Sequence, residues 1–123
     1  MKNELRRGDV VLVEFPLVGS TKGGRKKRPA LVVQQDRYNR RRAVVILAAI
    51  TSSTARHRLP CKMLVTQKSP EGHRSGLKMD SVVDCQTLVT IPREVITKKL
   101  GSLPKGFMRR IDEALKDALG LTG

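Results

Sequence analysis

Short apolar segments rich in β-branched residues follow one another along most of the chain, and this succession limits the possible folds more than any other feature. The first segment spans Asp9–Pro16, with Gly8 and Pro16 at its ends. Further segments cover residues 28–35, 43–51, 59–66 and 81–91. Each has the composition of a β-strand, and turn residues separate them. Several short strands at this spacing predict a small, strongly curved β-barrel.

The segment at residues 43–51 is the centre of the predicted fold. Its apolar run is unbroken, which indicates a strand covered on both faces. Pro29 suits the start or the edge of the preceding segment, because proline cannot donate to a strand ladder. The polar stretches at residues 17–27, 36–42 and 67–76 are predicted loops or turns. Residues 92–100 are ambiguous, with a short helical turn as one interpretation.

The hydrophobic period changes near the C-terminus. Apolar residues recur there at three- and four-residue steps, at Met108, Ile111, Leu115, Ala118 and Leu119. This spacing predicts an amphipathic helix, and Gly120 supplies a stop signal. The expected fold is therefore mainly β with α, a small barrel followed by one helix.

The chain carries a large positive charge. Its 25 Lys and Arg residues against 11 Asp and Glu residues leave a net charge of +14, so a polyanion such as nucleic acid is the expected partner. The charge is uneven, because residues 1–78 hold 18 basic and five acidic side chains and residues 79–123 hold seven and six. Phe15, Tyr38 and Phe107 are the only aromatic residues, so phosphate contacts rather than base stacking should supply most of the affinity.

Length and composition exclude several classes of protein. A chain of 123 residues suits one domain, residues 1–123, and excludes a multidomain enzyme. The apolar runs are far shorter than the ~20 residues of a membrane span, and no signal peptide opens the chain, so a cytoplasmic location is expected. Cys61 and Cys85 have no companion at metal-ligand spacing, which predicts two reduced, buried thiols and no metal site. No cofactor-binding or general catalytic motif occurs.

Arg28 and Thr51 indicate a phosphate site. Arg28 closes a basic loop at the start of one predicted strand, and Thr51 ends another, followed by Ser52 and Ser53. If the two strands are antiparallel neighbours, these ends meet. A guanidinium beside hydroxyls suits a phosphodiester, because arginine offers a planar fork of donors to two phosphate oxygens. The alternative for Thr51 is a strand-end hydroxyl that satisfies a nearby backbone group.

These residues belong to an ordered series of short matches. The series runs through residues 8–16, 19–20, 23–24, 28–36, 39, 48–52, 59–60, 76–77, 81–83, 90–91, 100–103 and 108–121. In this order it resembles the MazF/PemK family of toxin endoribonucleases across nearly the whole chain. The resemblance implies a small SH3-like barrel of the MazF/CcdB type that cuts single-stranded RNA at short sequences, with no metal and no cofactor. It also implies a homodimer, to which the Phe107/Met108 side of the last helix and the fifth strand are candidate contributors, and an acidic antitoxin as partner.

The resemblance implies catalytic roles for Arg28 and Thr51 and extends to Ser52. In the family, the ribose 2′-hydroxyl attacks the adjacent phosphorus, which leaves a 2′,3′-cyclic phosphate and a 5′-hydroxyl. Arg28 would chiefly bind the nonbridging oxygens, because a guanidinium stays protonated at ordinary pH and transfers protons poorly, and a role as general acid stays open. Thr51 would orient the phosphate or the 2′-hydroxyl.

The chain departs from the family pattern in its fifth predicted strand. It reads Asp84-Cys85-Gln86 where some relatives have an Arg-Cys-Asp step, so the identity of the general base is open. Asp84 would serve if its side chain points into the groove, and is otherwise a solvated strand carboxylate. His57 is suited to proton transfer near neutral pH, and is otherwise an exposed loop residue that touches phosphate.

Loop residues complete the predicted RNA-binding site. The residues assigned to RNA binding are Lys22, Arg25, Lys26, Lys27, Asn39, Arg40, Arg56 and Arg58. Two other functions stay open at this stage. One is a noncatalytic RNA-binding module, which needs no active site, and the other is a gyrase-directed toxin on the same fold, whose known members end in a tryptophan-bearing tail that this chain lacks.

Overall fold

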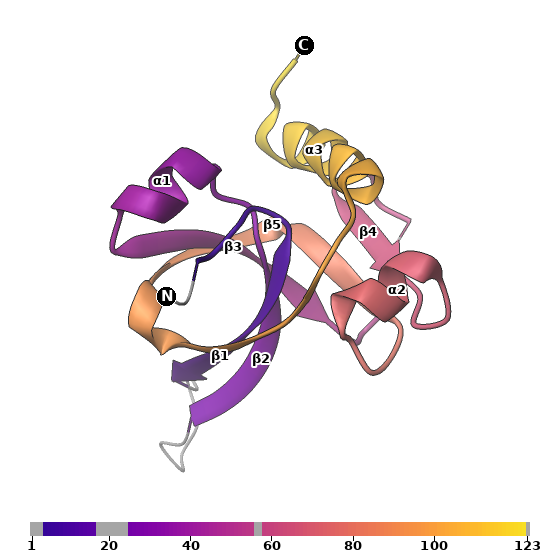
Figure 1. Ribbon diagram of the computed structural model, residues 1–123. Helices are drawn as coiled ribbons and strands as arrows, with labels where there is room; N and C mark the ends of the chain where they lie inside the picture. The colour runs from indigo at the N-terminus through magenta and orange to yellow at the C-terminus, as the bar shows by residue number, and fades with distance from the viewer. Residues whose placement is uncertain (1–3, 17–24, 56–57, 123) are drawn as a thin grey trace.

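The computed structural model describes residues 4–16, 25–55 and 58–122. The strands are β1 (Asp9–Pro16), β2 (Arg25–Val32), β3 (Val44–Thr51), β4 (Lys62–Val65), β5 (Ser81–Pro92) and β6 (Ile96–Ser102). The helices are α1 (Asp36–Arg41), α2 (Pro70–Ser75), the 3-10 turn η1 (Arg93–Val95) and α3 (Lys105–Leu119). The strands form one six-stranded sheet in the order β4-β5-β3-β2-β1-β6, with antiparallel pairing throughout. The sheet curls into a barrel-like shape (Figure 1), which stays open because no ladder joins β4 to β6 in the described ranges.

The five predicted strands and the C-terminal helix are confirmed, with different bounds. β2 begins at Arg25 rather than Arg28 and ends at Val32, since the chain then turns into α1. β4 is only four residues long. No helix in the described ranges is long and apolar enough to cross a membrane.

Three elements escaped the sequence prediction. α1 lies in a stretch predicted as a turn. The Arg93 guanidinium stabilises the C-terminal end of α1 by donating to the carbonyl oxygens of Asn39 and Arg42. α2 occupies the stretch predicted as a loop, although Ser69 caps it by accepting a hydrogen bond from Gly72 N at 3.0 Å. η1 confirms the helical turn expected in residues 92–100. The strand β6 that follows it was not predicted, because β6 forms by pairing with β1, which is far away in sequence.

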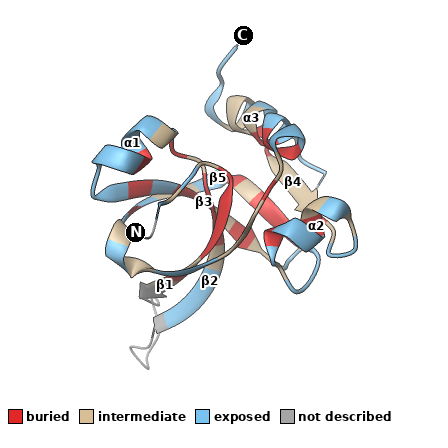
Figure 2. Cartoon of the chain, viewed as in Figure 1, coloured by how far each residue is buried: buried red, intermediate tan, exposed pale blue. Residues whose placement is uncertain are grey.

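Apolar side chains fill both faces of the sheet. One face, here called the helix face, carries Val10, Leu31, Ala48, Ile50, Val65, Val83 and Cys85 and packs against α3. The other, here called the barrel face, carries Val11, Val13, Ala30, Val32, Val45, Leu47 and Ile91. The buried positions lie in the first half of β1, at the end of β2, along β3 and at the start of β5 (Figure 2). The prediction that residues 43–51 are covered on both faces holds for the second half of β3 only, because Val44 and Ile46 are exposed.

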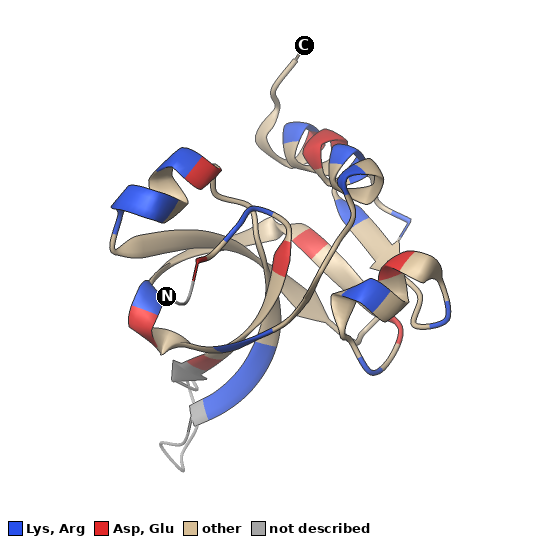
Figure 3. Ribbon diagram, in the orientation of Figure 1, with Lys and Arg blue, Asp and Glu red and all other residues tan. Residues whose placement is uncertain are grey.

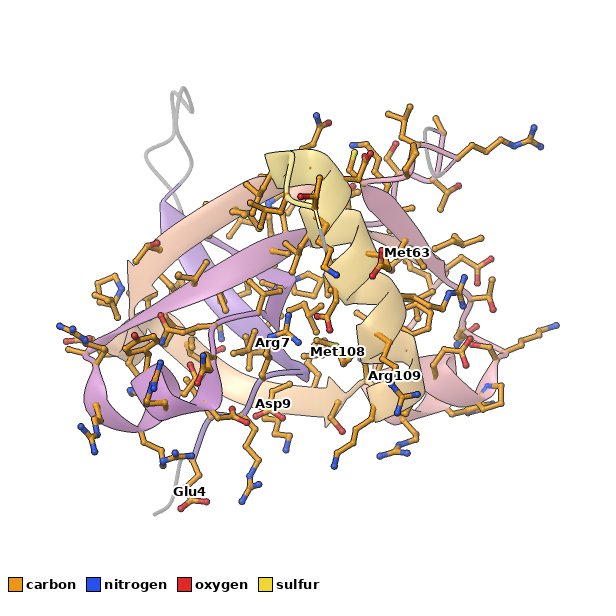
Figure 4. All side chains as sticks on the ribbon, turned by 90° about the horizontal axis from the view of Figure 1, so that it is seen from above. Glu4, Arg7, Asp9, Met63, Met108 and Arg109 are labelled. Carbon is orange, nitrogen blue, oxygen red and sulfur yellow. The ribbon has the colours of Figure 1, made fainter. Side chains whose placement is uncertain are left out.

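α3 lies across the helix face and is tied to the N-terminal segment. Phe107 and Met108 are buried in the chain's own core, so the expectation that they contribute to a dimer surface is wrong for this fold. The Arg7 guanidinium donates to Asp112 Oδ1 at 2.7 Å and to the Val33 carbonyl oxygen at 2.8 Å. Figure 4 shows Arg7 and Met108 on the same side of α3.

Cys61 and Cys85 are free and buried in neighbouring segments, as predicted. The Cys85 amide donates to the Cys61 carbonyl oxygen at 3.0 Å. Burial, with the nearby Asp84 carboxylate, raises the pKa of the Cys85 thiol to about 12. Cys85 is therefore an apolar core residue at neutral pH rather than a nucleophile.

Candidate functional site

Arg28 and Thr51 lie on neighbouring antiparallel strands. β2 and β3 pair through Ala30 with Ala49 and Leu31 with Ala48, and continuing this register by two residues sets Arg28 opposite Thr51. Arg28 is opposite Val13 of the barrel-face cluster, and Thr51 shares the face of Leu47 by strand alternation. The structure thus brings both residues to the barrel face, although Arg28 is the fourth residue of β2 rather than its first, while Thr51 is the last residue of β3.

Thr51 has an engaged hydroxyl oxygen and an adjoining cavity. Its Oγ1 accepts a hydrogen bond from Ser53 N at 3.1 Å, which is the strand-end interaction considered above. A hydroxyl that accepts this bond keeps its own proton for donation. A cavity of about 170 Å³ lies beside it, lined by Thr51, Ser53, Ala55, Lys62 and Val82. Thr51 can therefore donate toward a group in this cavity.

Lys62 is a cation of this site that sequence reasoning missed. It begins β4, directly opposite Asp84 of β5, and Asp84 is opposite Ala49 of β3. The Lys62 Nζ lies 3.0 Å from Asp84 Oδ2, and the two side chains are only 15% and 16% exposed. A lone lysine inside an apolar segment was the available signal, because a buried ammonium requires a partner.

Asp84 points to the barrel face, but its carboxylate is occupied. It accepts hydrogen bonds from Lys62, from Gln86 N at 2.9 Å and from Thr87 Oγ1 at 3.0 Å. Burial raises the pKa of Asp84, but these three donors and the Lys62 charge outweigh it, so the pKa lies below its ordinary value. A carboxylate with a lowered pKa is a poor proton acceptor at neutral pH, so the geometry favours a positioning role over that of a general base.

The ion pair between Lys62 and Asp84 predicts a pH-dependent contribution to stability. Because the pKa of Asp84 is lowered in the folded protein, ionised Asp84 stabilises the fold above the unfolded pKa of ~3.9, and this contribution is lost as the pH falls through the lowered value. We expect urea unfolding to show a larger loss of stability between pH 7 and ~pH 3 for the wild type than for Asp84→Asn. Asp117→Asn, which removes an exposed carboxylate of α3, is the matched control, and its loss of stability with falling pH should equal that of the wild type. Equal losses in the wild type and Asp84→Asn would contradict this reading.

Ser52 is not brought to the cavity beside Thr51. Its side chain is exposed and lines a separate cavity of about 550 Å³ with Thr54, Thr66 and Lys78 among others. Successive residues of an extended chain point in opposite directions, which is why Thr51 and Ser53 line one cavity and Ser52 and Thr54 the other. The geometry gives the predicted catalytic role of Ser52 no support.

Only some of the basic residues predicted to bind RNA lie near Arg28. Lys26 and Lys27 are exposed on β2, and alternation puts Lys26 on the face of Arg28 while Lys27 is opposite Glu14. Arg58 is exposed in the segment before β4. The predictions for Lys22, Arg56 and His57, and for the side chain of Arg25, lie outside the described residues.

Asn39 and Arg40 lie at the other end of the sheet, on α1. Asn39 is buried, with its amide nitrogen donating to the Gln34 carbonyl oxygen at 2.9 Å and to Asp36 Oδ1 at 3.1 Å, and its oxygen accepting from Gln34 Nε2 at 3.0 Å. We therefore remove Asn39 from the predicted RNA-binding set, because its polar atoms are used within the chain. Arg40 is exposed but separated from Thr51 by the length of β3. Figure 3 shows the basic residues of α1 and of β2 as two separate groups.

The described residues include no group of three or more His, Cys, Asp or Glu side chains placed to hold a metal ion. Lys62 and Thr51 line one cavity, and Arg28 lies on the same face of the neighbouring strand β2. Such a set suits an anionic ligand, since guanidinium and ammonium groups donate to phosphate oxygens.

Comparison with protein families identifies the chain. Residues 6–119 match the model of the PemK-like, MazF-like toxin of type II toxin–antitoxin systems. This protein belongs to that family. The toxin is also 36% identical over 118 residues to Endoribonuclease EndoA of Bacillus subtilis, a match that covers 95% of this chain and 96% of EndoA.

Solved structures share the toxin's fold. A mycobacterial endoribonuclease in complex with its cognate antitoxin superposes with a TM-score of 0.73 at 23% identity, covering 97% of this chain and 98% of that one. MazF in a MazE-MazF structure from Deinococcus radiodurans gives 0.74 at 19% identity, covering 98% and 100%. These matches confirm the mainly β, barrel-like fold with a C-terminal helix.

Proposed function

We propose that this toxin cleaves single-stranded RNA, including mRNA, at the strand-end site formed by Arg28, Thr51 and Lys62. The observation that carries the proposal is the delivery of two cationic groups and one hydroxyl to the same face and end of the sheet by β2, β3 and β4. EndoA, a relative at 36% identity, is named an endoribonuclease. The protein acts as a single domain, residues 1–123, in the cytoplasm.

The proposed reaction is an internal transesterification. The 2′-oxygen forms a bond to the adjacent phosphorus, the bond from phosphorus to the 5′-oxygen breaks, the 2′-proton passes to a base, and the 5′-oxygen takes up a proton. Two cations stabilise the charge that develops on the nonbridging oxygens, an electrostatic contribution of several kcal/mol in a preorganised site. The products are a 2′,3′-cyclic phosphate and a 5′-hydroxyl, and the step uses no metal and no cofactor.

Each residue has a distinct role in this proposal. Arg28 binds two nonbridging oxygens with its planar fork, and Lys62, which spends one of its three donors on Asp84, offers the others to the same phosphate. Thr51 donates its hydroxyl proton to the phosphate or holds the 2′-hydroxyl. Asp84 positions Lys62, which leaves the base assignment with His57.

The toxin's partners follow from its charge and its relatives. The mycobacterial relative was solved with its cognate antitoxin, and the Deinococcus relative as a MazE-MazF assembly. We propose an acidic cognate antitoxin for this chain, because a net charge of +14 favours an acidic segment that competes with RNA. We also propose that the toxin is a homodimer.

The activity is tested with Thr51 variants and a chelator. Purified wild type incubated with a long RNA and EDTA should give sequence-restricted fragments that end in cyclic phosphate. Thr51→Val, which keeps the side-chain shape but removes the hydroxyl, should lower the cleavage rate about 10–100-fold, as expected for loss of a hydrogen bond to a charged group. Thr51→Ser keeps the hydroxyl and should stay within a few-fold of wild type.

Two outcomes would contradict these assignments. RNA that is bound but left intact by the wild type would favour a noncatalytic module and reject the nuclease proposal. Cleavage by Thr51→Val at the wild-type rate would remove this hydroxyl from the mechanism. Thermal unfolding of each variant separates a lost chemical role from a lost fold.

A further inference from the structure

A second basic surface lies at the opposite end of β3 from Thr51. A cavity of about 700 Å³ is formed there between the N-terminal segment, α1 and η1. Five arginines line it, namely Arg6, Arg40, Arg41, Arg42 and Arg93. The cavity is large enough for a nucleotide, since small-molecule sites occupy ~300–1,000 Å³.

The two acidic groups at this cavity, Glu4 and Asp36, are both engaged, Glu4 with one of the five arginines. Glu4 lies 3.6 Å from the Arg6 guanidinium. Asp36 accepts hydrogen bonds from Arg7 N at 2.6 Å and from the Asn39 amide. Two carboxylates against five guanidinium groups leave a net positive surface. Such a surface attracts phosphate.

The arginines differ in how firmly they are held. Arg93 donates to the carbonyl oxygens of Asn39 and Arg42, so its guanidinium is anchored at the end of α1. Arg40 and Arg41 are exposed, and no ion pair to either occurs among the described residues. An anchored cation beside two exposed ones can bind successive phosphates without first breaking an ion pair.

Tyr38 adds an aromatic platform to the same helix. It is 40% exposed. The Arg37 and Arg42 guanidinium carbons lie 5.1 and 5.9 Å from the centre of its ring. Exposed aromatic rings and arginine planes are the groups on which unstacked bases of single-stranded RNA stack.

We propose that this surface, here called the α1 surface and made of Tyr38, Arg40, Arg41, Arg42 and Arg93, binds a single-stranded segment of the RNA substrate away from the scissile bond. The inference rests on the proposed function, because it assigns the surface to the same RNA. Phosphates contact the arginines, and one base stacks on Tyr38. The surface therefore favours long RNA without reading the cleavage sequence.

The separation of the two sites sets the RNA length that can reach both. Val44 and Thr51 lie at opposite ends of β3, seven residue steps apart, or about 23 Å at ~3.3 Å per residue. A stacked strand advances ~3.4 Å per nucleotide, so about seven nucleotides span this length. An RNA of about four nucleotides occupies the cleavage site alone, and one of about 16 reaches the α1 surface as well.

The test measures RNA binding in a cleavage-deficient background. Full-length Arg28→Ala carries in addition Arg40→Ala/Arg41→Ala, Tyr38→Ala, or the matched control Lys105→Ala/Arg109→Ala, which removes the same charge from exposed positions on α3. Fluorescence anisotropy gives the affinity for single-stranded RNAs of about four and about 16 nucleotides at several salt concentrations. Circular dichroism confirms that each variant is folded.

We expect Arg40→Ala/Arg41→Ala to weaken binding of the longer RNA about tenfold or more and to reduce its salt slope by about 1.4, at ~0.7 per lost single-strand phosphate contact. Tyr38→Ala should weaken it about 5–100-fold without changing the slope, and the short RNA should lose less than about twofold in every case. Equal losses in Arg40→Ala/Arg41→Ala and the α3 control would overturn the proposal. An acidic peptide is assayed in parallel, and if Arg40→Ala/Arg41→Ala loses affinity for this peptide but not for RNA, the proposal is overturned in favour of a protein partner.

The result is independent of whether the toxin cleaves RNA as proposed. RNA affinity is measured in the Arg28→Ala background, and this measurement does not require cleavage. An inactive wild type would therefore reject the nuclease mechanism, while the dependence of affinity on RNA length could still be measured. Conversely, active wild type with no length-dependent loss would reject the α1 surface alone.

Discussion

Replacing Arg28 with alanine is expected to reduce RNA cleavage about 10²–10³-fold, which corresponds to about 2.7–4 kcal/mol of transition-state stabilisation. Arg28 is exposed in the first half of β2, on the face that carries Thr51. Its removal takes away the donor fork for the nonbridging oxygens while leaving the core intact, so thermal stability should change by less than about 0.5 kcal/mol. Single-turnover cleavage of a defined RNA, together with a melting curve, measures both.

Two further variants make this prediction specific. Arg28→Lys keeps the charge but loses the planar fork, so its rate should fall between those of wild type and Arg28→Ala. Arg109→Ala removes one exposed charge from α3 and should cleave at close to the wild-type rate. Full activity in Arg28→Ala would remove the guanidinium from the mechanism, and a similar loss in Arg109→Ala would reduce the effect to general electrostatic attraction.

The largest expected effect on stability comes from truncating Ile111. This residue is fully buried where α3 packs on the helix face of the sheet. Ile111→Ala should lower the free energy of unfolding by about 2–5 kcal/mol, because the surrounding core relaxes only partly around the cavity. Denaturant unfolding monitored by circular dichroism gives this value.

Leu119 offers a matched control on the same helix. It is 56% exposed, so Leu119→Ala should change the free energy of unfolding by less than about 0.5 kcal/mol. Similar values for the two variants would mean that α3 is not held on the sheet by its buried side. Because the helix face lies on the other side of the sheet from Arg28 and Thr51, a folded Ile111→Ala variant should keep its cleavage rate per folded molecule.

Local pattern was sufficient for most of the architecture. The β-branched segments led to five strands, and the three- and four-residue period led to α3, because both depend on interactions between near neighbours in sequence. Ser69 as cap and Pro70 at the first helical position are local signals for α2. β6 was not, since its residues become a strand only by pairing with β1.

The site divides in the same way. Arg28 and Thr51 could be proposed from strand ends and from the family resemblance, and the antiparallel pairing of β2 and β3 agrees with that reasoning. The pairing of Lys62 with Asp84 could not, because it depends on the register of β4 against β5. Asn39 was misassigned for a different reason, because its burial and its hydrogen bonds to Gln34 and Asp36 depend on how α1 packs.

Composition and short-range pattern were therefore enough to predict a basic, mainly β protein with a C-terminal helix, and the family resemblance added the toxin function and the roles of Arg28 and Thr51. The three-dimensional fold was needed to learn that Lys62 joins Thr51 at one cavity, that Asp84 is held in an ion pair, and that the arginines of α1 form a separate surface. The physical reason is that charge and periodicity are properties of neighbouring residues, whereas a site requires a strand register that long-range packing sets.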